Sequence, residues 1–255
     1  MERLRDKKVV VNPKEQVQYL NVSKKFAKIV CPCRILVAGP SLSGKSQFLS
    51  QLIEYRQQLF DTDFDRIVYS SPNATSGAQF KYVESLRKFF TDIEIISDLP
   101  DPVKLNLTSD GSHTLILVDD HMTSWNNSPL ALKLLTIHSH HYNLSIAVTS
   151  HNLFAGSKYN KTLFRNYSEI VLLYARSDKL TLRTLGYQLF PEQPRILIRS
   201  MEWVENNLTD EQVKYLFIDI SPLTHLPSNL IIRTNIFPRG GILSPIFFVP
   251  GAPEN

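Results

Sequence analysis

The fold of this chain is decided by one stretch, Arg34-Ile-Leu-Val-Ala-Gly-Pro-Ser-Leu-Ser-Gly-Lys-Ser46. Its apolar start, Ile35 to Ala38, is typical of a short buried strand. The strand leads directly into Gly39-x-x-x-x-Gly44-Lys45-Ser46, which is the pattern of a phosphate-binding P-loop. A helix is predicted next, because apolar residues recur there at three- and four-residue spacing: Phe48, Leu49, Leu52, Ile53 and Tyr55. This context favours a nucleotide site over a Gly/Ser turn that binds nothing.

The loop predicts a site for Mg-ATP. Gly39 and Gly44 let the backbone turn tightly and direct its N–H groups at phosphates. Lys45 is expected to bridge the β- and γ-phosphates, and the Ser46 hydroxyl to coordinate Mg²⁺. The predicted cofactors are therefore ATP and Mg²⁺. The residues expected to bind them are Gly39, Pro40, Ser41, Leu42, Ser43, Gly44, Lys45, Ser46 and Gln47.

Strand-like runs alternate with helix-like runs along the rest of the chain. The predicted strands are Arg66–Ser71, Ile93–Ile96, Thr114–Val118, Ser145–Thr149 and Ile170–Tyr174, and helices are expected at residues 79–90 and 130–136. This alternation, together with the P-loop, predicts an α/β fold, a three-layer P-loop NTPase with a mostly parallel central sheet that helices cover on both faces. We expect Arg66–Ser71 to be inserted between the P-loop strand and the strand at Thr114–Val118, the additional-strand arrangement of ATPases rather than of small nucleotide kinases.

Two carboxylates end one of these strands, in Thr114-Leu-Ile-Leu-Val-Asp119-Asp120. The run resembles a Walker B motif, in which a buried strand brings an acid beside the P-loop. Asp119 is expected to hold the Mg²⁺ shell, and Asp120 to orient or deprotonate the attacking water. The alternative for such a pair is a loop start or a helix cap. The P-loop upstream favours the metal-binding interpretation.

Candidate sensor and finger residues follow the strand at Ser145–Thr149. His151 or Asn152 is placed to sense the γ-phosphate, although a local turn also explains Asn and Ser at this point. An arginine-finger-type group acting on a neighbouring subunit is expected among Lys161, Arg165 and Arg176, each of which is alternatively a surface charge. The predicted catalytic residues are Lys45, Asp119, Asp120, Asn152 and Arg165, and the predicted metal ligands are Ser46 and Asp119.

Composition bounds the organisation of the chain. With 255 residues and 43% hydrophobic content, it fits one domain with extensions. We expect a basic N-terminal extension at 1–30, the P-loop ATPase domain at 31–236 and a Pro/Gly-rich tail at 237–255. The apolar piece Ile246–Val249 is expected either to pack on its own core or to join a neighbour's sheet edge. No run approaches the roughly 18 apolar residues that span a bilayer, so we expect an intracellular protein without a membrane partner.

Three further features leave alternatives open. Cys31 and Cys33 are too few for a disulfide framework or a complete zinc site, so two reduced thiols are expected. The net charge of +4 and the basic residues near the N-terminus mildly favour an anionic partner, with a solvated basic arm as the alternative. The histidines His138, His140 and His141 do not all face one point, which favours structural roles over a metal site.

Several separate motifs together resemble the FtsK/HerA-type DNA-packaging ATPases of double-stranded DNA viruses, most closely those of adintovirus-like viruses and Polinton/Maverick elements. Beyond the P-loop, the motifs are Asp119-Asp120-x-Met122, Ser139-His140-His141-x-Asn143, Asn152-Leu-Phe154, Tyr215-Leu-Phe-Ile-Asp219 and Arg233-Thr-Asn-Ile-Phe-Pro238. They span roughly residues 30 to 240 in the family's order. The resemblance implies a fold of RecA/FtsK-like type. It also implies a homo-oligomeric ring that hydrolyses ATP to thread double-stranded DNA into a capsid, with capsid proteins as partners. It also implies a location in the host nucleus, at a cytoplasmic virus assembly site or in the virion.

The chain departs from the family at three positions. His151 replaces a glutamine that positions water, Asp120 stands where related motors often have Glu, and Leu42 stands where many relatives have Gly. These departures keep two other functions open. One is an ATP-binding switch or inactive structural subunit without turnover, and the other is a nucleotide or small-molecule kinase.

Overall fold

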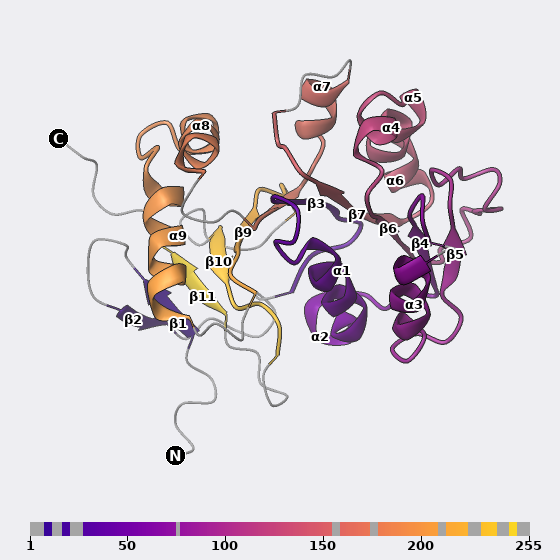
Figure 1. Ribbon diagram of the computed structural model, residues 1–255, viewed down its shortest axis with the longest axis horizontal. Coiled ribbons are helices and arrows are strands. Elements are labelled where there is room, and N and C mark those ends of the chain that lie inside the picture. The colour runs from indigo at the N-terminus through magenta and orange to yellow at the C-terminus, as the bar shows by residue number, and fades with distance from the viewer. Residues whose placement is uncertain are drawn as a thin grey trace.

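Within the part of the chain that the structure describes, 11 strands form one sheet at the centre of the molecule (Figure 1). The computed structural model describes residues 8–11, 17–20, 28–74, 77–154, 159–173, 178–208, 213–223, 231–238 and 245–248. The spatial order of the strands is β2-β1-β11-β10-β9-β8-β3-β7-β6-β4-β5. Their bounds are β1 Lys8–Val11, β2 Val17–Leu20, β3 Arg34–Ala38, β4 Arg66–Ser70, β5 Glu94–Ile96, β6 Thr114–Val118, β7 Leu144–Ser150, β8 Glu169–Leu172, β9 Leu216–Asp219, β10 Ile232–Thr234 and β11 Ile246–Phe248.

Helices cover both faces of this sheet, which confirms the predicted α/β class. The helices are α1 Lys45–Glu54, α2 Arg56–Leu59, α3 Gly77–Leu86, α4 Met122–Asn126, α5 Pro129–Lys133, the π-helix η3 Leu134–His138, α6 Ser139–His141, α7 Asn160–Phe164, α8 Lys179–Leu189 and α9 Ile196–Asn207. One hydrophobic core joins α1, α2 and α3 to one face, and a second core joins α4, α5, η3, α7, α8 and α9 to the other. The longer helices contribute apolar stripes at three- and four-residue spacing, as α1 does with Phe48, Leu49, Leu52 and Ile53.

The parallel half of the sheet runs from β5 to β8 and contains the P-loop strand. Strand β7 pairs in parallel with β3 on one side and with β6 on the other. It is therefore Leu144–Ser150, and not Arg66–Ser70, that separates the P-loop strand from the acid-bearing strand. The prediction for Arg66–Ser71 was wrong on this point, since β4 pairs with β6 and β5 further out. Parallel strands are joined by crossovers, so the order along the chain does not fix the order in space.

The other half of the sheet is mainly antiparallel. Strands β9, β10 and β11 follow β8 in successive antiparallel pairs, and β1 then pairs in parallel with β11. The segment Ile246–Phe248 thus lies between β10 and β1 in the sheet of its own chain. Of the two predicted alternatives for this apolar segment, it packs on its own core. Both flanking segments of the chain contribute strands to the sheet.

Most local predictions from the sequence are confirmed within a few residues. The predicted helix at 79–90 is α3 at Gly77–Leu86, and the one at 130–136 is α5 continued by the π-helix as far as His138. Tyr174 at the end of a predicted strand, several N-terminal basic residues and most of the Pro/Gly-rich tail lie outside the described residues. Within the described ranges, no helix is long and apolar enough to cross a membrane.

Candidate nucleotide-binding site

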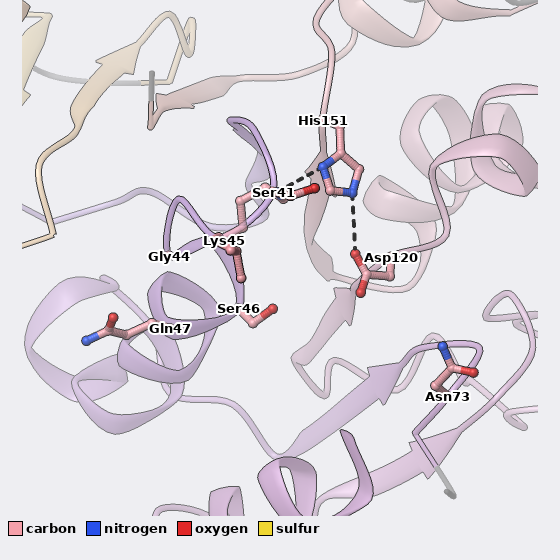
Figure 2. Close-up of a pocket in the computed structure, with 9 residues that line it drawn as sticks. Ser41, Gly44, Lys45, Ser46, Gln47, Asn73, Asp120 and His151 are labelled. Carbon is pink, nitrogen blue, oxygen red and sulfur yellow. Dashed lines mark hydrogen bonds and ion pairs between the residues drawn. The ribbon is translucent and has the colours of Figure 1, made fainter. Parts of the chain in front are cut away.

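The P-loop lies at the carboxyl ends of the parallel strands, where ligands of open α/β sheets bind. A cavity of ≈ 670 Å³ opens there, and nine of the described residues line it (Figure 2). They are Ser41, Leu42, Gly44, Lys45, Ser46, Gln47, Asn73, Asp120 and His151. The P-loop, the end of β6 and the end of β7 therefore meet around one space, as predicted for Lys45, Ser46 and Asp120.

The loop backbone turns in the way the two glycines allow. Gly44 has φ 94°, a left-handed conformation that favours glycine, and it directly precedes α1. Gly39 packs so closely that an added Cβ would lie 2.8 Å from the Cβ of Leu173 and 2.6 Å from the Ser43 hydroxyl. Leu42 is also left-handed, with φ 64°, and its side chain is fully exposed at the cavity rim. A bulky residue in this conformation is strained.

Lys45 points back into the loop. Its ammonium donates to the carbonyl oxygens of Gly39 at 2.9 Å and Pro40 at 2.8 Å, and its Nζ lies 3.2 Å from Nδ1 of His151. The side chain is buried, and burial lowers the pKa of Lys45 while Asp120 and Asp119 act in the opposite direction. The two carboxylates favour the charged form of Lys45, which is the form that attracts a phosphate.

Ser46 and Asp119 meet beside the lysine. The Ser46 hydroxyl donates to Oδ2 of Asp119 at 2.7 Å, and Tyr69 from β4 donates to the same oxygen at 2.6 Å. Thr149 at the end of β7 donates to the other carboxylate oxygen, Oδ1, at 2.8 Å. Asp119 is completely buried and is oriented by these three hydroxyl groups. The tyrosine and the threonine were not among the predicted site residues.

This donor set fits a magnesium ion. Mg²⁺ prefers oxygen ligands and keeps several waters, so one hydroxyl and one carboxylate beside a triphosphate are sufficient protein ligands. Ser46 in the first turn of α1 and Asp119 directly after β6 supply those groups, and the N-terminal N–H groups of α1 also favour anions. Ser46 would hold the ion directly, and Asp119 would act through water.

Asp120 extends from the end of β6 into the cavity. It has φ 58°, a left-handed conformation that Asp tolerates better than most residues, and its backbone N–H donates to the Thr149 hydroxyl at 3.1 Å. One hydroxyl thus orients both acids, since it also donates to Asp119. Oδ1 of Asp120 lies 3.7 Å from Nε2 of His151 across the cavity. The carboxylate is about half exposed and can reach a water molecule.

Other predicted residues lie away from the cavity. The Asn152 side chain accepts from the backbone N–H of Phe154 at 2.9 Å, so it forms a local turn, and His151 is the neighbour that lines the cavity. Lys161 and Arg165 are exposed on and just after α7, which leaves their finger role a prediction. Arg176 lies outside the described residues. Asn73, after β4, lines the cavity but was missed, because an isolated Asn after a strand looks like turn chemistry.

The last two sequence motifs pack against the P-loop helix. Phe48 of α1 makes edge contacts with Tyr215 at 5.1 Å and Phe237 at 4.9 Å between ring centroids. Arg233 is completely buried, with NH2 3.5 Å from Asp219 and its guanidinium 4.7 Å from the centre of the Phe217 ring. These motifs therefore fix α1 against the antiparallel half of the sheet.

No family model matches this sequence, and no curated protein matches it. Among solved structures, the chain is similar to the genome-packaging NTPase B204 of Sulfolobus turreted icosahedral virus 2 in complex with ATP-gammaS. The TM-score is 0.46 at 13% sequence identity, over 74% of this chain and 93% of that chain.

Proposed function

We propose that this protein binds Mg-ATP at the P-loop and hydrolyses it to move double-stranded DNA, as a packaging or translocating motor of a DNA virus or virus-derived element. The observation that carries the hydrolytic part is the contact of Ser46 with Asp119 at 2.7 Å, beside Lys45 and Asp120. Phosphoryl transfer to water uses a metal-binding hydroxyl and acid, an amine that binds phosphate, and a second acid that reaches solvent.

Each residue has a distinct role in this reaction. Lys45 and the backbone N–H groups at the start of α1 bind the β- and γ-phosphates and offset their charge. Bound Mg²⁺ would neutralise further charge on the phosphate oxygens, held by Ser46 and, through water, by Asp119. Asp120 accepts a hydrogen bond from the attacking water, orients it towards the γ-phosphorus and takes its proton. Positioning and charge neutralisation supply most of the rate enhancement.

The DNA part of the proposal is supported by the motif resemblance and by charge. The motifs from Asp119 to Pro238 resemble those of FtsK/HerA-type packaging ATPases, and the net charge of +4 suits a polyanionic partner. The exposed Arg165 after α7 suits a group that acts on the nucleotide of the next subunit in a homo-oligomeric ring. Capsid proteins would then be further partners, in the host nucleus, at a cytoplasmic assembly site or in the virion.

The test is steady-state ATP hydrolysis with and without linear double-stranded DNA, across a series of salt concentrations. DNA is expected to stimulate hydrolysis, and rising salt to weaken the stimulation, because contacts to backbone phosphates release counterions. Hydrolysis that is independent of DNA at low salt would contradict the motor function and leave an ATPase of another kind.

A second candidate is an ATP-binding switch without turnover. It is favoured by His151 at the position where the resembled family has a water-positioning glutamine, and by the engagement of His151 with Lys45. Nucleotide binding that Lys45→Ala abolishes, together with wild-type turnover no faster than that variant's, would select this candidate.

A further inference from the structure

His151 lies close to two residues with different roles in the proposed reaction, the phosphate-binding Lys45 and the water-orienting Asp120. Its Nδ1 lies 3.2 Å from Nζ of Lys45, and its Nε2 lies 3.7 Å from Oδ1 of Asp120 (Figure 2). The first distance is a hydrogen bond, and the second is just longer than one. The histidine is thus engaged with the lysine and stands within a small movement of the acid.

The partners determine where the ring carries its proton. A lysine ammonium is a donor only, so Nδ1 of His151 must present its lone pair to Lys45. In the neutral ring the proton then resides on Nε2, the nitrogen that faces the Asp120 carboxylate. The ring therefore accepts from the lysine and offers its N–H to the acid.

Lys45 has no proton left for a phosphate in this arrangement. An ammonium has three N–H groups, and three acceptors surround it: Gly39 O, Pro40 O and His151 Nδ1. A phosphate that binds Lys45 must replace one of them. Of the three residues that accept from Lys45, only His151 is among the described residues that line the cavity. It is therefore the acceptor on the side from which phosphates enter.

We propose that His151 is a positioning residue that exchanges hydrogen-bond partners. It accepts from Lys45 in the nucleotide-free protein, and it donates to Asp120 once the phosphates of the nucleotide bind Lys45. The inference deepens the proposed function and rests on it. Once Lys45 turns to the nucleotide, the ring loses its first partner and closes the 3.7 Å gap, so that Nε2–H donates to Asp120. Arrival of the phosphates thereby fixes the acid that orients the attacking water.

This exchange predicts opposite effects on binding and on turnover when the ring is removed. In His151→Ala, Lys45 loses an acceptor that competes with the phosphates, so nucleotide is expected to bind roughly fivefold to tenfold more tightly. Turnover is expected to fall by roughly 10- to 100-fold, because Asp120 is no longer held. His151→Gln retains one donor and one acceptor, so it is expected to restore turnover in large part.

The experiment measures equilibrium binding of the non-hydrolysable analogue AMP-PNP with Mg²⁺ and steady-state ATP turnover. The proteins are wild type, His151→Ala, His151→Gln and, as the matched control, His141→Ala, whose histidine is exposed at the end of α6. Nitrogen NMR of the ring provides a second measurement at pH 8. The signal of His151 Nδ1 is expected to be that of an unprotonated nitrogen in the free protein and to shift when AMP-PNP binds.

The outcomes separate this inference from the function on which it rests. Weaker or unchanged AMP-PNP binding in a folded His151→Ala variant would overturn the exchange while leaving the nucleotide site intact. A proton on Nδ1 in the free protein at pH 8 would overturn it as well. Wild-type protein that binds no nucleotide would overturn the proposed function, and the inference with it.

Discussion

The hydroxyl of Ser46 donates to Oδ2 of Asp119 at 2.7 Å, although 73 positions separate the two residues in the sequence. This contact joins the start of α1 to the end of β6 beside the cavity. Ser46→Ala removes the hydroxyl that would hold Mg²⁺ and leaves the rest of the loop intact. Turnover at saturating ATP is expected to fall about 100-fold, with a higher Mg²⁺ requirement. A magnesium titration of ATP hydrolysis measures both effects, and an unchanged magnesium midpoint would contradict the assignment of Ser46.

Thr149 orients both acids through one hydroxyl, which donates to Asp119 and accepts from the N–H of Asp120. Thr149→Val keeps the shape but leaves those two groups without this partner. Turnover is expected to fall about 10- to 100-fold, with a smaller change in KM, because Asp120 loses its position. Thr149→Ser, which retains the hydroxyl, is the control and should stay near wild type. Equal losses in the two variants would show that the methyl group, and not the hydroxyl, matters.

Leu42 is fully exposed and left-handed, with φ 64°. Leu42→Gly removes this backbone strain and is expected to stabilise the protein by about 0.5–1 kcal/mol, after the greater freedom of glycine in the unfolded chain is included. Leu180→Gly is the matched control, since Leu180 is also exposed but lies within α8. Leu180 lies in the first turn of α8, where glycine is expected to destabilise by less than the roughly 1 kcal/mol that it costs in a helix interior. Denaturant unfolding measures the change in the free energy of unfolding for both variants. Destabilisation by Leu42→Gly would show that the backbone at Leu42 is not strained.

Glu169 gives the protein a specific dependence of stability on pH. Burial and the neighbouring Asp219 raise the pKa of Glu169 to about 8, against the opposing hydrogen bonds from Ser168 and the Arg34 N–H. In the folded protein Glu169 then keeps a proton that it loses in the unfolded chain above its ordinary pKa of 4.5. The contribution of Glu169 to stability is therefore present below about pH 4.5 and declines as the pH rises towards about 8.

Glu169→Gln removes this titration and keeps a carbonyl that can accept from Ser168 and Arg34. Between about pH 5 and 8, the stability of the wild type is expected to decline relative to the variant by about 1 kcal/mol per pH unit. Urea unfolding at several pH values measures the difference. Parallel pH profiles for the two proteins would show that Glu169 is already ionised in the folded state.

Local motifs were readable from the sequence, whereas long-range pairing was not. The P-loop and the acids after Thr114–Val118 depend on short patterns, and the structure brings Lys45, Ser46 and Asp119 together as those patterns predict. The position of β7 between β3 and β6 depends on crossovers, which periodicity does not encode. Tyr69 was missed because a tyrosine in an apolar strand is indistinguishable from a core residue until its hydroxyl is seen on Asp119. Arg233 was identified only as part of a motif, and its burial was not predicted, because a carboxylate and an aromatic ring from other strands accommodate it in the core.

The most direct test of a hydrolytic site is steady-state hydrolysis of Mg-ATP by wild type, Lys45→Ala and Asp120→Asn, with nucleotide binding measured for each. We expect turnover by the wild type, loss of both binding and turnover in Lys45→Ala, and binding without turnover in Asp120→Asn. Turnover by Asp120→Asn at the wild-type rate, or wild-type turnover no greater than that of Lys45→Ala, would contradict the assignment.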